Sequence, residues 1–217
     1  MQFSTIVGAL LSASVALASP TPTIEERQAA CGTGISAARS QEVVRAFSSA
    51  GVTPTLIPSI SPKSDLKITY PSVNINLGTQ TTTLQTVQAP AFQFTTPVGD
   101  SASQTYSLFL VDPDVPGPNG PPVLGSPRLN FLHWYVSGIK RCGTSGNTVT
   151  IYEPPTPVSP GEQHRYTWLV YREPAGYSPN VLQAQVRPGF DLLGYTSRGK
   201  LGQPIAGNFM NQSITNT

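Results

Sequence analysis

The chain has 217 residues, of which 38% are hydrophobic and 11% are charged, and its formal net charge is +2. This length suits one domain with a full hydrophobic core. The basic residues are scattered rather than clustered, so nothing in the charge pattern points to a nucleic-acid partner. The 22 prolines and 19 glycines lie mainly between apolar runs, which indicates turns rather than disorder.

Residues 1–18 have the features of a secretory signal peptide. Ile6 to Leu17 form an apolar, small-residue core, and Ala16-Leu17-Ala18 offers a small-x-small cleavage site. The core is shorter than the roughly 20 residues that span a bilayer, and no other segment is long and apolar enough. We therefore expect a secreted, extracellular protein without a transmembrane segment. Residues 19–34 would form a leader segment and residues 35–217 a single domain.

Covalent modifications are predicted at the cysteines and at one sequon. The chain has two cysteines, Cys31 and Cys142. In an oxidising compartment we expect them to form one disulfide, and two buried free thiols are the alternative. Asn211 begins the sequence Asn-Gln-Ser and is expected to be exposed and glycosylated.

The elements follow in chain order, beginning with one helix. Residues 36–50 are predicted to be helical, with Val43, Val44 and Phe47 on one face and Gly51 as the stop. From residue 55 onward short alternating apolar segments predict strands. These lie at 66–70, 73–77, 84–87, 92–94, 106–111, 131–136, 149–152, 166–171 and 201–209, with a short helix at 191–197. Such spacing indicates a mainly β, sheet-on-sheet or largely antiparallel fold with few peripheral helices.

Polar residues that could bind a ligand or take part in catalysis lie near the ends of these apolar strands. Asp112 and Asp114 flank Pro113, and carboxylates at i and i+2 point to one side if the backbone stays extended. His133 lies in an apolar stretch, where a buried imidazole needs a partner. An aspartate would favour its charged form, and an imidazolium held in this way can receive an anion. Turn formation for the aspartates and a core role for the histidine are the structural alternatives.

Several segments together resemble the phosphatidylethanolamine-binding protein (PEBP) family. They are LVDPDVP from Leu110 to Pro116, LHW from Leu132 to Trp134, and GEQHRY from Gly161 to Tyr166, in this order. The segment LGQPIAG from Leu201 to Gly207 is similar to the family's terminal segment. The resemblance covers roughly residues 50–210, and the ordered set is more specific than any single motif.

The resemblance implies a PEBP-like β-sandwich with a small anion pocket at one end. By this resemblance, the pocket residues are Asp112, Asp114, His133, His164 and Tyr166. The implied ligand is a small anion, such as a phosphate or a phospholipid head group. One departure concerns the segment after Tyr152, where the family often has glycines. Here Pro154 lacks an N–H, Thr156 keeps one, and Glu153 adds a negative charge.

Three functions remain open from the sequence. The leading one is a secreted, non-enzymatic binding protein for small anions, without a cofactor. The second, implied by the resemblance, is inhibition of a protease such as a serine carboxypeptidase, through the protein surface. The third is a metal-dependent hydrolase with a site of two histidines and two carboxylates. This third function is disfavoured because the chain has neither an HExxH motif nor a G-x-S-x-G motif. We therefore expect neither a metal site nor enzymatic activity.

Overall fold

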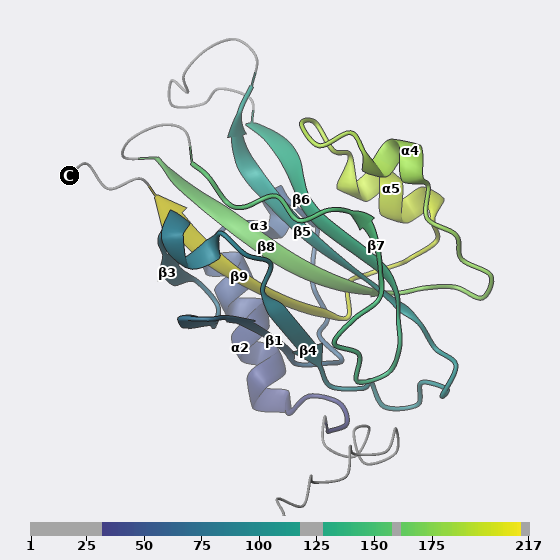
Figure 1. The fold of residues 1–217 in the computed structure, drawn as a ribbon. Helices are drawn as coiled ribbons and strands as arrows, with labels where there is room; N and C mark the ends of the chain where they lie inside the picture. The colour runs from purple at the N-terminus through teal and green to yellow at the C-terminus, as the bar shows by residue number, and fades with distance from the viewer. Residues whose placement is uncertain (1–31, 118–127, 158–161, 214–217) are drawn as a thin grey trace, which may run out of the picture.

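Two packed β-sheets form the centre of the computed structural model, which describes residues 32–117, 128–157 and 162–213 (Figure 1). The small sheet is antiparallel and has the order β2-β1-β4. The large sheet has the order β3-β9-β8-β5-β6-β7 and is antiparallel except for the parallel pair of β3 with β9. The mainly β sandwich that the sequence predicts is therefore confirmed.

Most predicted strands are present, with boundaries that differ at several ends. The small sheet consists of β1 (Leu66–Tyr70), β2 (Val73–Ile75) and β4 (Ala91–Phe94). The large sheet consists of β3 (Thr79–Thr81), β5 (Tyr106–Pro116), β6 (Arg128–Ile139), β7 (Asn147–Thr150), β8 (Gln163–Arg172) and β9 (Ala206–Ser213). The helices are α2 (Ala37–Ser49), α3 (Val52–Thr55), α4 (Val181–Ala184), α5 (Leu192–Arg198) and the 3-10 helix η1 (Thr83–Thr86).

The first helix shows why this segment is helical and where it ends. The Ser36 side chain caps α2 by accepting a hydrogen bond from the Arg39 N–H. Gly51 follows the helix with a φ of 67°, a conformation that glycine adopts without a steric cost. Val43 and Phe47 are buried as predicted, whereas Val44 is exposed, because it lies one position off the buried face.

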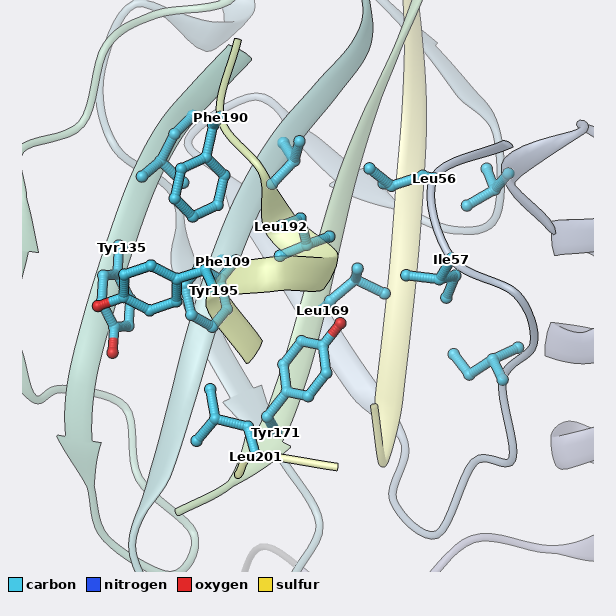
Figure 2. Packing of buried hydrophobic residues seen from close by; sticks show 14 of the residues in the cluster. Leu56, Ile57, Phe109, Tyr135, Leu169, Tyr171, Phe190, Leu192, Tyr195 and Leu201 are labelled. Carbon is cyan, nitrogen blue, oxygen red and sulfur yellow. The ribbon is translucent and has the colours of Figure 1, made fainter. Parts of the chain in front are cut away.

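The large sheet is buried on both faces, so its central strands are apolar at successive positions rather than alternating. Leu108 and Leu110 of β5 pack between the sheets with residues such as Phe94 and Trp168. Phe109 points the opposite way and stacks on Tyr135, with ring centroids 4.2 Å apart. Figure 2 shows this outer core, in which side chains from the sheet meet those of α5 and of the segment that follows α3.

Two predicted strands are wrong in place or in type. The segment 84–87 lies in and beside the 3-10 helix η1, and Leu84 is 88% exposed, so its apolar residues do not form an edge strand. A capping box between Thr82 and Gln85 favours this turn over extended structure. The final strand begins at Ala206 rather than at residue 201, and the sequence did not indicate β3, α3 or α4.

The remaining predictions about modification and processing have different outcomes. Residues 1–31, with the expected signal peptide, most of the leader segment and Cys31, lie outside the described residues. The pairing of Cys31 with Cys142 therefore stays a prediction, although the structure has no free cysteine among the described residues. Asn211 is half-buried in β9 and its Nδ2 donates to the Gly78 carbonyl at 3.3 Å, so the expected exposure is wrong. Glycosylation at Asn211 stays a prediction.

Candidate functional site

A cavity of about 250 Å³ lies where three central strands approach one end of the large sheet. The carboxyl end of β5 pairs with the start of β6 and lies beside the first part of β8 (Figure 1). The segment after β7 closes the remaining side. The cavity is lined by Asp112, Val115, Pro116, Phe131, His133, Glu153, Pro154, Thr156, His164 and Tyr166.

A larger hollow of about 440 Å³ lies elsewhere, between α5 and residues 57–58. Lys200 and Tyr171 are its only ionisable lining residues among the described part of the chain. The smaller cavity gathers two imidazoles and two carboxylates and is therefore the candidate site on chemical grounds.

A local irregularity of β5 brings Asp112 to this cavity. The pairing of β5 with β6 shifts register between Asp112 and Val115, as expected where Pro113 removes a backbone donor. Asp112 is 1% exposed, and its Oδ1 accepts the Asp114 N–H at 2.8 Å. β5 continues past Asp112 to Pro116, so Asp112 lies at an irregularity within the strand rather than at its end.

His164 is the imidazole of the site that is held by a carboxylate. Its Nδ1 donates to Asp112 Oδ2 at 2.7 Å, and both side chains are buried. Burial alone would lower the pKa of His164, but the hydrogen bond and charge of Asp112, helped by Glu162, raise it above the ordinary value. The partner of His164 therefore favours the imidazolium form. Its Nε2 is buried and has no hydrogen-bond partner.

His133 has a different environment from the one that the sequence predicts. Its Nδ1 lies 2.7 Å from the Glu153 carbonyl oxygen and donates to it, so no aspartate holds this ring. Burial lowers the pKa of His133, against the opposing effect of the Glu153 carbonyl and of Asp112. The expectation that an aspartate keeps His133 charged is wrong, since a carbonyl partner orients the ring without supplying a counter-charge.

Tyr166 connects the two sides of the cavity. Its hydroxyl hydrogen bonds with Asp112 and also accepts the Thr156 N–H, and burial raises its pKa further, so it stays neutral. Its ring lies edge-on to His133 and stacked on His164, with centroids 5.1 and 6.1 Å away. The Tyr166 hydroxyl proton and the Thr156 N–H are thus committed within the protein. These two groups therefore hold the two sides of the cavity together.

Asp114 does not line the cavity. Its carboxylate accepts hydrogen bonds from Arg165 at the backbone N, Nε and Nη2, at 2.8, 2.8 and 2.6 Å. Arg165 also donates to the Ala50 carbonyl at 2.9 Å, which ties this end of the sheet to the end of α2. The expectation that both aspartates enter one pocket is wrong, because the irregular backbone between them removes the i, i+2 relation of a regular strand.

Sequence reasoning missed the charged residues around the rim. Glu162 Oε2 lies 3.5 Å from His164 Nε2, and the same carboxylate pairs with Arg128. On the opposite side, Arg187 contacts Glu153 at 3.3 Å and donates to the Ile151 carbonyl at 2.8 Å. The signal for Glu162 was present, because it stands two positions before His164 at a strand start. No comparable signal marked Arg128 or Arg187.

The described residues contain no group of three or more His, Cys, Asp and Glu side chains arranged to hold a metal ion. The His164 Nδ1 is committed to Asp112, and the His133 Nδ1 to a carbonyl. The arrangement instead suits a small oxyanion, because it presents a cationic imidazole within a largely apolar wall. Within the described ranges, no helix is long and apolar enough to cross a membrane.

Comparison with known proteins gives a consistent family. The phosphatidylethanolamine-binding protein family model matches residues 67–217. A 26 kDa secreted antigen of Toxocara canis is 32% identical over 170 residues, which cover 75% of this chain and 61% of that protein. The chain thus spans about three fifths of the length of that relative.

Solved structures show the same fold. A carboxypeptidase Y inhibitor, in complex with its cognate proteinase, aligns with a TM-score of 0.66 at 22% identity, covering 81% of this chain and 96% of the inhibitor. A phosphatidylethanolamine-binding protein from Plasmodium vivax aligns with a TM-score of 0.63 at 19% identity, covering 78% and 96%. With the family model matching more than half of its length, the chain belongs to the phosphatidylethanolamine-binding protein family.

Proposed function

We propose that the chain is a secreted, non-enzymatic protein that binds a small phosphate-bearing ligand in the cavity around His164. One observation carries the proposal: the buried His164, held by Asp112 at 2.7 Å, borders a cavity, and its second nitrogen has no hydrogen bond and lies 3.5 Å from the Glu162 carboxylate. A buried donor without a partner has a free-energy cost that an oxyanion would remove. The ligand's phosphate accepts from His164 Nε2, while Phe131 and Pro154 exclude water.

The two histidines contribute unequally to this binding. His164 supplies the charge, whereas His133 is neutral and its Nδ1 proton is already donated to Glu153. Secretion is supported by the small-x-small site after the apolar core at the amino terminus and by the likeness to a secreted antigen. The free phosphate and the phospholipid head group share the chemistry that the cavity recognises.

Calorimetric titration tests the proposal and separates the two ligand sources. The arms are inorganic phosphate, phosphoethanolamine and glycerophosphoethanolamine, which carries the diester of a lipid head group. We expect His164→Gln to weaken binding at least tenfold or so, since a charge-assisted hydrogen bond is lost. His133→Ala should weaken it less. Asp114→Asn is the matched control and should bind as wild type, because Asp114 faces Arg165. Equal affinity of wild type and His164→Gln would exclude the cavity as the site.

A second candidate function is inhibition of a protease through the surface. It is supported by the fold shared with the carboxypeptidase Y inhibitor. Inhibition assays with a serine carboxypeptidase and with endoproteases test it, using wild type and His164→Gln in parallel. Inhibition that survives the substitution would assign it to the surface, and no inhibition of any protease tested would count against this candidate.

A further inference from the structure

The Glu162 carboxylate lies beside His164 Nε2, where an incoming anion would have to bind. Its Oε2 is 3.5 Å from His164 Nε2, the nitrogen that Asp112 does not hold. The side chains of Glu162 and His164 are 9% and 3% exposed. Both atoms are buried, and neither has a hydrogen-bond partner. Glu162 therefore covers the imidazolium electrostatically without making the hydrogen bond that would satisfy it.

The position of Glu162 is fixed from its outer side. Arg128 at the start of β6 pairs with the Glu162 carboxylate through Oε1, and the same guanidinium donates to the Asp114 carbonyl at 2.7 Å. Burial alone would raise the pKa of Glu162, but the hydrogen bond and charge of Arg128, with the charge of His164, hold it below its ordinary value. The free site thus contains a charged carboxylate beside the imidazolium.

An oxyanion and this carboxylate cannot both remain charged at one buried imidazolium without strong repulsion. Resting on the proposed function, we infer that Glu162 is an internal competitor for the anion position on His164, so that an oxyanion binds together with a proton. The proton resides on Glu162 or on the ligand, as in carboxylate pairs that share one proton. Glu162 thereby selects anions that can bring a proton and disfavours permanently ionised ones.

The sign of the pH effect follows from the charges. A bound anion raises the pKa of Glu162, so the complex holds more protons than the free protein, and affinity rises as the pH falls. Other groups also face the pair: Asp112 from β5, His133 and Arg128 from β6, Tyr166 from β8, and Glu153 from the segment after β7. Of these, His133 is neutral in the free protein and can also take up a proton. The test must therefore separate the proton uptake of Glu162 from that of His133.

Sulfate is a suitable probe because it stays fully ionised across the relevant pH range and carries no proton of its own. Calorimetry in buffers of different ionisation enthalpy measures the protons taken up when sulfate binds. For Glu162→Gln we expect roughly tenfold tighter sulfate binding near neutral pH and smaller proton uptake than in wild type. Glu153→Gln is the matched control, because Glu153 also lines the cavity but pairs with Arg187; it should keep the wild-type proton uptake.

The outcomes separate this inference from the function on which it rests. Sulfate binding that requires His164, but whose affinity and proton uptake are the same in Glu162→Gln as in wild type, would overturn the competitor role and leave the anion site standing. No sulfate or phosphate binding by any variant would overturn the proposed function itself. Should Glu162→Gln fold poorly, Glu162→Ala and the wild-type sulfate affinity between about pH 5 and pH 8 provide the same test.

Discussion

The two walls of the cavity each contain one histidine, and they shift the pKa values of these two histidines in opposite directions. On the wall from β5 and β8, His164 donates to a buried carboxylate, and its pKa is raised. On the wall from β6 and the segment after β7, His133 donates to a carbonyl, and its pKa is lowered. Residue type therefore does not decide the direction in which the pKa of a buried histidine shifts; the formal charge of its hydrogen-bond partner does.

The largest effect should come from Asp112→Asn, which removes the counter-charge but keeps the shape of the side chain. His164 would then be a buried cation without a partner, or would lose its proton. We expect the free energy of unfolding to fall by about 3 kcal/mol near pH 6 and phosphate binding to disappear. Urea denaturation and calorimetry measure the two effects. A variant as stable as wild type, with an unchanged His164 titration, would contradict the assignment of charge to this wall.

The pH dependence of stability should differ in sign between the two histidines. For His164, whose folded pKa is raised, the contribution is fully present below the unfolded pKa of about 6.5 and is lost as the pH rises through the folded value. For His133, whose folded pKa is lowered, the contribution is present above about 6.5 and is lost as the pH falls through the folded value. His164→Gln should thus lower the free energy of unfolding most at acidic pH, and His133→Gln should lower it most at higher pH.

These contributions can be measured without ambiguity, because the chain has only two histidines. An NMR titration should give one imidazole signal that titrates above the ordinary pKa and one below it, and each variant assigns one of them. Urea denaturation at acidic, neutral and alkaline pH measures the stabilities. Two signals that titrate at the same pH would show that the two walls do not shift the histidine pKa values in opposite directions.

The smallest effect should come from Asp114→Asn, which breaks the pair with Arg165 outside the cavity. Side chains of the pair are 13% and 19% exposed, so we expect a loss of about 1 kcal/mol in the free energy of unfolding. The His164 pKa and phosphate affinity should stay the same. Thermal or urea denaturation measures the free energy of unfolding. A loss of phosphate binding comparable to that in Asp112→Asn would place Asp114 in the site after all.

Part of the site could be predicted from the sequence because it depends on short-range order. Asp112, His133, His164 and Tyr166 belong to short ordered motifs, and all of them line the cavity. Which aspartate enters it depends on the register shift between β5 and β6, and periodicity cannot predict an irregular backbone. The partner of each histidine depends likewise on segments 20 and 52 residues away in the chain.

The sequence by itself determined the mainly β class, the helix that begins after Ser36 and most strands, because apolar runs and caps are local signals. Tertiary structure alone decided that the last strand starts at Ala206 and that Glu162 covers His164. The charge states of the two histidines also could not be predicted from the sequence. They depend on burial and on the nearest partner, and both are known only once the strands are packed.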